Sequence, residues 1–279
     1  MKICIKGVLF VVILLSFFAT CLVFFPFRLI SPWGARRVLA QVLCYFARVT
    51  LWVFGINCRV VGRDFGHVGK EPHALCLSNH VSYLDVVILA SLRPVCFVTS
   101  QEVKEDWFLG PITRVAACLY VERRNRRKHF LELEELSEAL RNGLSVLFFP
   151  EATSTNAERV LRFRGLLFRA AIYAEVPVKP YCLNYLSVNG QPWSTLNRDV
   201  VCWYGSMQFG PHFFAFLQQD RIDVEIVDLP LIAVDAATNR NDLIELSHHY
   251  VARSFKPVAG SSSSLADNVL EPRSGILLE

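Results

Sequence analysis

The segment Asn79-His80-Val81-Ser82-Tyr83-Leu84-Asp85 lies between two apolar runs of different character. Residues 74–78, before it, are typical of a short buried strand, and residues 86–89, after it, are typical of the start of a helix. His80 is therefore expected in a strand-to-helix loop. Such loops often hold catalytic side chains on a rigid scaffold.

His80 and Asp85 are the acid–base residues of this segment. On a continuous helix, five positions correspond to about 140° of rotation, so the two side chains would diverge. They can meet only if His80 precedes the helix and Asp85 faces back from its first turn. A carboxylate on one imidazole nitrogen orients the ring and stabilises its protonated form, as in a general base. The nucleophile would then be a hydroxyl that the substrate brings.

Ser82 offers a different explanation of the same segment. The pattern Ser82-x-x-Asp85 fits a capping box, in which the serine caps the helix and the carboxylate accepts from a backbone N–H. His80 would then be an ordinary loop residue. The segment alone leaves both explanations open.

Composition indicates a membrane-associated protein. The 279 residues are 53% hydrophobic and 19% charged, which is apolar for a soluble protein. A net charge of +4 is too small to indicate nucleic acid as a partner and suits an anionic lipid surface. The nine cysteines form no C-x-x-C pair, which argues against a zinc site or disulfide framework and suits a reducing compartment. No metal or cofactor is expected.

Residues 7–25 carry no charge and would form a helix about 28 Å long, close to the ~30 Å of a bilayer core. A cleaved signal peptide is the alternative, but the run lacks an A-x-A site, so an uncleaved anchor is predicted. Its flanking charges are Lys2 and Lys6 before it and Arg28, Arg36 and Arg37 after it. Their balance leans slightly towards a cytoplasmic remainder.

A second apolar segment, residues 38–54, contains Gln41 and Arg48. On a helix these two and Arg37 fall within about 40° of one another, which makes a narrow polar stripe. The stripe favours a helix in the membrane interface or packed on the first helix. The alternative is a buried helix of the soluble domain, with Arg48 in a salt bridge. Residues 1–56 are therefore predicted to be a membrane anchor and interfacial helix pair.

Strand and helix patterns alternate after this pair. The predicted strands are residues 74–78, 95–99, 119–122, 145–149, 177–183, 200–204 and 222–227, and the predicted helices are residues 83–92, 128–142, 166–175, 211–219 and 242–254. Alternation of this kind predicts an α/β domain over residues 57–255, with a mixed sheet flanked by helices. Residues 256–279, which include four consecutive serines, are predicted to be a disordered tail.

Three further motifs follow the first. In the sequence Phe148-Phe149-Pro150-Glu151-Ala152-Thr153, Glu151 follows a predicted strand and could bind a hydroxyl, orient a base or cap the next turn. In Tyr120-Val121-Glu122-Arg123, the arginine suits a phosphate or carboxylate. The basic run 123–128 is either a solvated loop or a contact for anionic headgroups. Residues 176–180, V-P-V-K-P, are typical of a strand entry.

The order N-H-x-S-x-x-D, Y-V-E-R, F-P-E-A-T and V-P-V-x-P resembles the four motif blocks of the lysophospholipid acyltransferase family, over about residues 55–252. Its best-known members are the 1-acylglycerol-3-phosphate acyltransferases. The resemblance implies acyl transfer from acyl-CoA or acyl carrier protein to a lysolipid hydroxyl, at a cytoplasmic membrane surface. The acceptor expected first is 1-acylglycerol-3-phosphate, giving phosphatidic acid, and another lysolipid such as lyso-ornithine lipid comes second.

By this resemblance, His80 is the general base and Asp85 its orienting partner. Arg123 corresponds to the phosphate-binding arginine of the second block, and Glu151 to the acceptor-binding glutamate of the third. Thr153 and Arg164 are also predicted to bind substrate. Backbone N–H groups at the start of the helix after Val81 are candidate donors to the oxyanion.

The chain departs from the family pattern at three places. Ala152 and Ala117 stand where the family has glycine, and a methyl group there would narrow a close approach or shift a turn. Ser154 replaces a frequent arginine. In residues 163–168, which resemble F-K-x-G-A-F, the glycine falls one place early, although Arg164 keeps a cation.

Two other functions remain open from the sequence. A thioesterase or lipid hydrolase would use the same His–Asp pair on water. A non-catalytic lipid-binding membrane protein of this fold is the second alternative, and the two glycine-to-alanine changes are the features that favour it.

Overall fold

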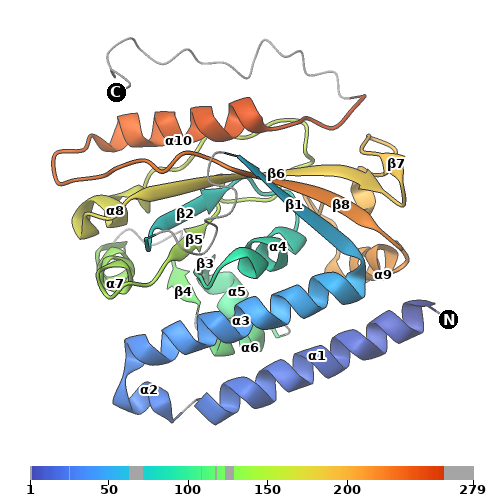
Figure 1. Cartoon of the computed structure of the whole chain (residues 1–279), viewed down its shortest axis with the longest axis horizontal. Helices are drawn as coiled ribbons and strands as arrows, with labels where there is room; N and C mark the ends of the chain where they lie inside the picture. The colour runs from blue at the N-terminus through green and yellow to red at the C-terminus, as the bar shows by residue number, and fades with distance from the viewer. Residues whose placement is uncertain are drawn as a thin grey trace.

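A computed structural model of the chain describes residues 2–24, 26–62, 72–107, 109–116, 118–122 and 129–260. Its centre is a mixed eight-stranded sheet in the order β1-β8-β6-β2-β5-β3-β4, with β7 paired to β6 (Figure 1). The strands are β1 (Ile56–Gly62), β2 (Leu75–Ser78), β3 (Cys96–Ser100), β4 (Leu119–Val121), β5 (Val146–Phe148), β6 (Val178–Val188), β7 (Gln191–Pro192) and β8 (Ile222–Asp228). The predicted fold class is confirmed.

Helices cover both faces of this sheet. They are α1 (Lys2–Phe24), α2 (Phe27–Ile30), α3 (Pro32–Phe54), α4 (Leu84–Leu92), α5 (Gln101–Glu105), α6 (Leu109–Val115), α7 (His129–Arg141), α8 (Phe168–Ala174), α9 (Phe209–Leu217) and α10 (Arg240–Ser254), with a short 3-10 helix η1 (Arg198–Val200). Buried residues of α1, α3, α4 and α9 form one hydrophobic core with the sheet. Those of α7, α8 and α10 form a second core on the other face.

The strands β2 and β5 are adjacent and parallel, with Leu77 paired to Phe148. All four residues of β2 are buried, which suits a central strand covered on both faces. Because the two strands are parallel, their carboxyl ends meet at the same edge of the sheet. The chain leaves β2 at Asn79 and leaves β5 at Phe149, so the first and third motif blocks come together there.

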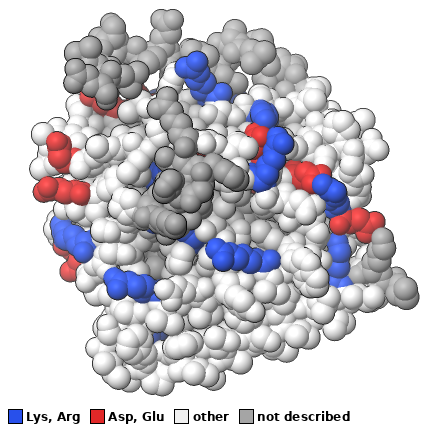
Figure 2. Space-filling view, in the orientation of Figure 1, with Lys and Arg blue, Asp and Glu red and all other residues white. Residues whose placement is uncertain are grey.

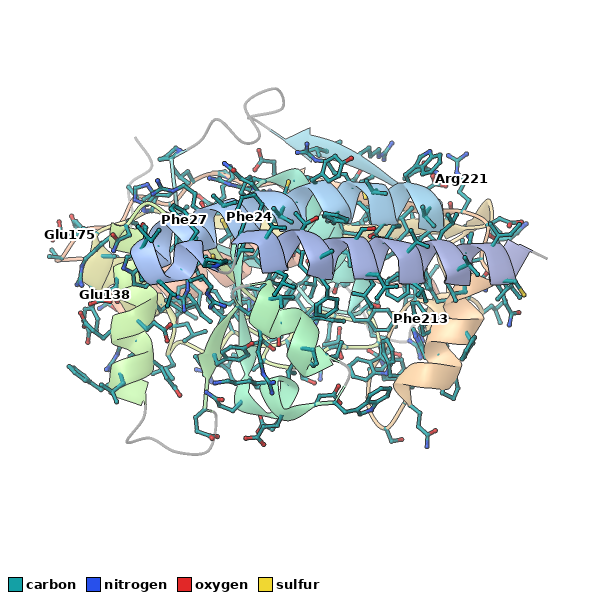
Figure 3. All side chains as sticks on the ribbon, turned by 90° about the horizontal axis from the view of Figure 1, so that it is seen from below. Phe24, Phe27, Glu138, Glu175, Phe213 and Arg221 are labelled. Carbon is teal, nitrogen blue, oxygen red and sulfur yellow. The ribbon has the colours of Figure 1, made fainter. Side chains whose placement is uncertain are left out.

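The two N-terminal helices form a hairpin along one side of the domain. Figure 3 shows α1 and α3 side by side across this face, with Phe213 of α9 close to α1. Both helices are long and apolar enough to cross a membrane. The outward apolar side chains of α1 stay exposed: Val8 is 63%, Leu15 63% and Leu22 70% accessible. Figure 2 shows few charged side chains on the band of surface over α1.

Two arginines of the polar stripe of α3 reach the α/β domain, although all three residues of the stripe are exposed. Arg48 donates to the backbone carbonyls of Ser91 at 2.8 Å and Leu92 at 3.4 Å, at the carboxyl end of α4. Arg37 donates to the carbonyl of Asn142 at 2.7 Å, just beyond α7. Cations at helix carboxyl ends satisfy carbonyls that lack partners within the helix. The helix α3 also packs on α1, as predicted. Its Arg37 and Arg48 bind the domain through backbone carbonyls rather than a salt bridge.

Two predicted segments differ in the structure, namely the strand 200–204 and the start of the tail 256–279. The predicted strand 200–204 is wrong: the 3-10 helix η1 ends at Val200, and the residues after it are irregular and bond to the first motif block through the N–H of Trp203. The strand β1 was not predicted, and it begins at Ile56, one residue before the predicted domain boundary.

The predicted disordered tail is wrong for residues 256–260. The N–H of Val258 donates to the carbonyl of Ala157 at 2.9 Å, and the carbonyl of Ala259 accepts from Thr195 at 3.0 Å. These residues therefore belong to the domain. Residues 261–279 lie outside the described part of the chain.

Candidate active site

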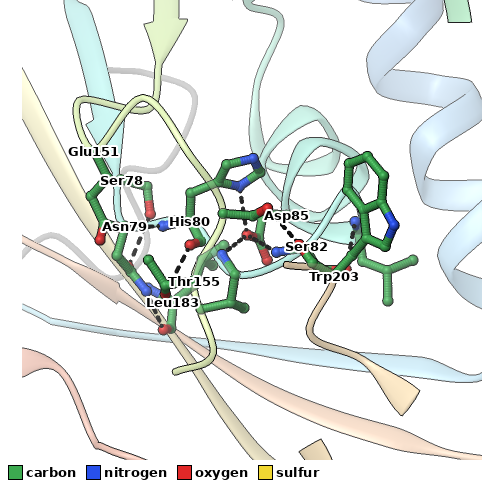
Figure 4. Close-up of polar contacts among 12 residues, drawn as sticks. Ser78, Asn79, His80, Ser82, Asp85, Glu151, Thr155, Leu183 and Trp203 are labelled. Atoms are coloured by element: carbon green, nitrogen blue, oxygen red, sulfur yellow. Dashed lines mark hydrogen bonds and ion pairs between the residues drawn. The ribbon is translucent and has the colours of Figure 1, made fainter. Parts of the chain in front are cut away.

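His80 and Asp85 are in direct contact. Nδ1 of His80 lies 2.9 Å from Oδ2 of Asp85. The helix α4 begins at Leu84, so His80 precedes it and Asp85 faces back from its first turn, as the spacing required (Figure 4). An ionised carboxylate only accepts hydrogen bonds, so Nδ1 carries the proton and the lone pair is on Nε2. The imidazole is thereby arranged to accept a proton at Nε2.

The same carboxylate also shapes the loop. Oδ2 of Asp85 accepts from the backbone N–H groups of Val81 at 2.7 Å and Ser82 at 2.9 Å. Oγ of Ser82 accepts from the N–H of Leu84 at 3.3 Å. Asp85 therefore contacts the imidazole and also fixes the loop backbone, while the N-cap of α4 is Tyr83 rather than Ser82. The general-base role of His80 stays a prediction. The N–H groups of Val81, Ser82 and Leu84 have acceptors within the loop, and binding of the oxyanion by the start of this helix stays a prediction.

Asn79 ties the loop to the neighbouring strand. Its buried amide donates to the carbonyl of Leu183 at 3.0 Å and accepts from the N–H of the same residue at 2.8 Å. The side chain thus makes the pair of hydrogen bonds that a backbone residue would make in the sheet. The first turn after β2 is fixed to β6 by this pair.

Glu151 holds His80 by its backbone. Oε1 of Glu151 accepts from the N–H of His80 at 2.8 Å, and Oε2 accepts from the N–H of Leu161 at 2.7 Å. Burial raises the pKa of Glu151 to about 7, against the two backbone donors, which lower it. Each oxygen of the carboxylate therefore accepts one backbone hydrogen bond, and one of the two bonds fixes the histidine loop. Binding of the acceptor by Glu151 stays a prediction.

Two further segments close around the loop. Thr155 donates to the carbonyl of His80 through its N–H at 3.0 Å and its hydroxyl at 3.2 Å. The N–H of Trp203 donates to the carbonyl of Val81 at 2.8 Å, and its own carbonyl accepts from the hydroxyl of Ser154. The imidazole itself stacks on the ring of Phe149, with centroids 3.9 Å apart. Figure 4 shows Thr155 and Trp203 on either side of the loop that holds His80 and Asp85.

Comparison with known proteins places this site in a family. A family model described as Acyltransferase matches residues 59–184. A lyso-ornithine lipid O-acyltransferase of Brucella abortus (strain 2308) is 32% identical over 206 residues, which cover 71% of this chain and 76% of that protein. The chain belongs to the lysophospholipid acyltransferase family. It is therefore an O-acyltransferase.

Other proteins similar to this acyltransferase are also named as lysolipid acyltransferases. A lyso-ornithine lipid O-acyltransferase of Rhizobium meliloti (strain 1021) is 26% identical over 81% of this chain and 78% of that protein. A 1-acyl-sn-glycerol-3-phosphate acyltransferase of Neisseria gonorrhoeae is 32% identical over 47% of this chain and 52% of its own. The crystal structure of the 1-acyl-sn-glycerophosphate (LPA) acyltransferase PlsC from Thermotoga maritima has the same fold, with a TM-score of 0.54 and 16% identity over 80% of this chain and 81% of its own.

The remaining predicted residues of the acyltransferase site are exposed or lie outside the described residues. Thr153 is exposed on the turn after Glu151. Arg164 is also exposed, and its N–H donates to the carbonyl of Pro150 at 2.8 Å, which brings its backbone back to that turn. Arg123 and Ala117 lie outside the described residues, and so does the basic run 123–128. The substrate-binding roles of Arg123, Thr153 and Arg164 stay predictions.

The departure of this acyltransferase at Ala152 has a backbone explanation. Ala152 has a φ of 58°, in the left-handed region where glycine is favoured. Its N–H donates to the carbonyl of Phe149 at 3.0 Å and closes the turn. The alanine thus keeps the turn expected of a glycine, at a cost in backbone strain.

His80 and Asp85 form a dyad, and the sequence patterns missed one of its polar contacts. The hydroxyl of Tyr185, on β6, donates to Oδ1 of Asp85 at 2.7 Å. These residues are a hundred positions apart, so only the placement of β6 beside β2 brings them together.

The cysteines near the motif strands are core residues, as expected. Cys118 and Cys182 are buried, and burial raises the pKa of Cys118 to about 12, which disfavours a thiolate nucleophile.

Proposed function

We propose that this acyltransferase moves a fatty acyl group from a thioester donor, acyl-CoA or acyl carrier protein, to the free hydroxyl of a lyso-ornithine lipid. The supporting observation is the share of this chain over which the two kinds of relative align. The lyso-ornithine lipid O-acyltransferases of Rhizobium meliloti, Brucella abortus and Rhodobacter capsulatus align over 71% to 81% of this chain. The 1-acyl-sn-glycerol-3-phosphate acyltransferases of Neisseria align over 47%.

The dyad supports direct transfer without an acyl-enzyme. Nε2 of His80 removes the proton from the acceptor hydroxyl while that oxygen attacks the thioester carbonyl. Asp85 holds the other nitrogen and stabilises the imidazolium that forms. Collapse of the tetrahedral intermediate expels the thiolate of the donor, which takes up the proton from His80. A positioned base contributes about 10²- to 10⁴-fold to such a step.

The phosphate-bearing acceptor 1-acylglycerol-3-phosphate is the second candidate. The resemblance of the motif blocks ranked it first, and Arg164 is exposed next to the Glu151 turn. The third block, however, has Ser154 in place of the frequent arginine, and the serine hydroxyl is bonded to the carbonyl of Trp203. One cation fewer is a smaller loss for a zwitterionic headgroup than for a phosphate monoester, whose charge approaches −2 at pH 7.

Membrane attachment follows from the hairpin of α1 and α3, with the catalytic domain proposed on the cytoplasmic side, where acyl thioesters are made. The helix α1 lies along the domain rather than projecting from it. Near its start, Lys6 donates to the carbonyls of Phe54 and Gln219, and Phe10 packs on Phe213 with centroids 5.2 Å apart. Further along, Phe17 packs edge-on against Phe46. These contacts along α1 suit a helix whose outer face enters one leaflet of the bilayer while the catalytic domain stays in water.

Deletion of residues 1–27 tests this attachment. It should release the protein only in part, because α3 keeps exposed Trp52 and Tyr45. Complete solubility of a folded deletion variant would contradict a membrane role for α3. Digestion by protease added to inverted membrane vesicles, but not to intact spheroplasts, would support the cytoplasmic orientation, and the reverse pattern would contradict it.

The acceptor is tested with purified protein in phospholipid vesicles. Acyl-CoA and acyl carrier protein thioesters are each supplied with lyso-ornithine lipid, with 1-acylglycerol-3-phosphate or with no acceptor, and the products are identified by mass. The proposal predicts that ornithine lipid forms faster than phosphatidic acid at equal acceptor concentration. Faster formation of phosphatidic acid would reverse the order of the two acceptors. Free fatty acid formed at the same rate without acceptor would indicate a thioesterase instead.

A further inference from the structure

Tyr185 makes a contact with the dyad that the mechanism above does not use. Its hydroxyl donates to Oδ1 of Asp85 at 2.7 Å, while the imidazole and two backbone N–H groups bond to Oδ2. Asp85 is 0% exposed and Tyr185 is 4% exposed. The two carboxylate oxygens therefore have separate sets of donors. In the described part of the chain, Tyr185 is the side-chain donor to Oδ1.

The tyrosine is held rigidly from its own strand. The pairing of β6 with β8 shifts register between Tyr185 and Ser187, which is a bulge-type irregularity. Such irregularities redirect a side chain and recur next to active sites. The ring of Tyr185 also stacks on Trp193, with centroids 5.4 Å apart and an interplanar angle of 30°. The hydroxyl is thus fixed towards the carboxylate rather than free to rotate away.

The phenol remains protonated throughout the range in which the enzyme would work. Burial, followed by the charge of Asp85, raises the pKa of Tyr185 well above its ordinary value. Tyr185 therefore acts as a neutral donor and exchanges no proton with substrate. Without its hydroxyl, a buried carboxylate oxygen would lose its side-chain partner, and the rotation of the carboxylate would be held by the donors to Oδ2 alone.

We propose that Tyr185 is a positioning residue for acyl transfer, whose hydroxyl fixes the rotation of the Asp85 carboxylate and so keeps Oδ2 aligned with Nδ1 of His80. The inference rests on the proposed role of His80 as general base. Misplacement of a reacting group by about 1 Å can reduce turnover about a hundredfold. The effect of Tyr185 should therefore appear in kcat rather than in KM, and only while Asp85 can accept its bond.

The test is Tyr185→Phe, which keeps the ring and removes the hydroxyl. We expect kcat to fall about tenfold or more, with KM for donor and acceptor unchanged within about twofold. The matched control is Tyr181→Phe, which removes the same hydroxyl from a buried tyrosine four residues earlier on β6. This control should keep the wild-type kcat. Melting temperatures of both variants in the same vesicles separate a loss of turnover from a loss of folded protein.

A double-mutant cycle with Asp85→Asn gives a second measurement. If Tyr185 acts through the carboxylate, Tyr185→Phe should change kcat by less than about twofold in the Asp85→Asn background, because the oriented partner is already lost. An equal fold-loss in both backgrounds would overturn the proposal. So would a wild-type kcat for Tyr185→Phe, or a loss that Tyr181→Phe reproduces. An active His80→Ala variant would instead overturn the general-base role of His80, and the acceptor assay tests the proposed acceptor separately, so these failures are distinguishable.

Discussion

Glu151, at the end of β5, accepts the backbone N–H of His80, at the end of β2, across a distance of 2.8 Å. Its other oxygen accepts from Leu161 at 2.7 Å, and the side chain is buried. A carboxylate in this position determines where the imidazole stands, because it fixes the backbone from which the ring projects. The third motif block thus supports the first through the loop, whatever further contacts it makes with substrate.

Glu151→Gln should lower kcat about tenfold and leave KM for the acceptor unchanged. Glutamine has one acceptor oxygen, so one of the two backbone N–H groups would face its amide donor and lose a hydrogen bond. A lost bond of this kind costs about 1–3 kcal/mol, so the melting temperature should fall as well. Steady-state kinetics in vesicles and thermal unfolding give both values.

The control for this substitution is Glu138→Gln, on the exposed side of α7, which should change neither value. If Glu151 served mainly to bind the acceptor hydroxyl, KM for the acceptor would rise while kcat and stability stayed near wild type. That result would contradict the supporting role.

Stability should also depend on pH through Glu151. Burial raises the pKa of this carboxyl to about 7 in the folded protein, from an ordinary 4.5. Below pH 4.5 it is neutral in both states, and above pH 7 only the folded protein holds a buried charge, so its contribution is lost as pH rises through this window. The loss is at most about 3 kcal/mol. Glutamine does not titrate, so the melting temperature of Glu151→Gln relative to wild type should rise from pH 5 to pH 8. A constant difference across that range would refute the raised pKa.

Ala152→Gly should stabilise the protein. Ala152 has a φ of 58°, which costs an alanine about 1–2 kcal/mol, whereas glycine loses only about 0.5–1 kcal/mol in chain entropy. The free energy of unfolding should therefore rise by about 0.5–1 kcal/mol, with kcat within about twofold of wild type. Ala171→Gly, inside α8, is the comparison and should destabilise by about 1 kcal/mol or more. Equal destabilisation by both substitutions would show that the Ala152 turn is unstrained.

Ser154→Arg should shift the acceptor preference towards 1-acylglycerol-3-phosphate over a zwitterionic lysolipid, mainly through KM. A charge-assisted bond to phosphate contributes about 1.5–3 kcal/mol, which corresponds to about tenfold or more in discrimination. Ser154→Met is the control, because it also removes the hydroxyl bonded to Trp203 but adds no charge. If the ratio of kcat/KM values is unchanged while Arg123→Ala collapses it, Ser154 lies outside the headgroup site.

The sequence predicted the contacts that depend on local spacing. The His80–Asp85 pair needs only a loop followed by a helix, and both are visible in the alternation of residues 74–89. The buried strands β2, β5 and β6 were predicted for the same reason, because they are short apolar runs. The run 200–204 was misassigned as a strand because burial alone makes it apolar. Its Trp203 N–H bonds to the histidine loop instead of a neighbouring strand.

Contacts across the sheet could not be predicted from one sequence. The Glu151–His80 and Tyr185–Asp85 bonds depend on the strand order β6-β2-β5, which apolar patterns do not specify. The edge strand β1 was missed because Asn57 and Arg59 interrupt its apolar residues. Arg48 was correctly placed on a polar stripe, but its partners are backbone carbonyls of α4. Every residue has a backbone carbonyl, so the amino-acid sequence could not identify these partners.

The turnover of His80→Ala is the most direct test of the account, since Nε2 of His80 is the atom proposed to take the acceptor's proton. The variant is compared with wild type and Asp85→Asn in the same vesicles, with acyl transfer to lyso-ornithine lipid and to 1-acylglycerol-3-phosphate measured by product mass. We expect kcat of His80→Ala to fall by at least about a hundredfold for both acceptors, with the melting temperature and membrane fraction preserved. Asp85→Asn should fall less far. Retention of a tenth of the wild-type turnover by folded His80→Ala would contradict the general-base mechanism.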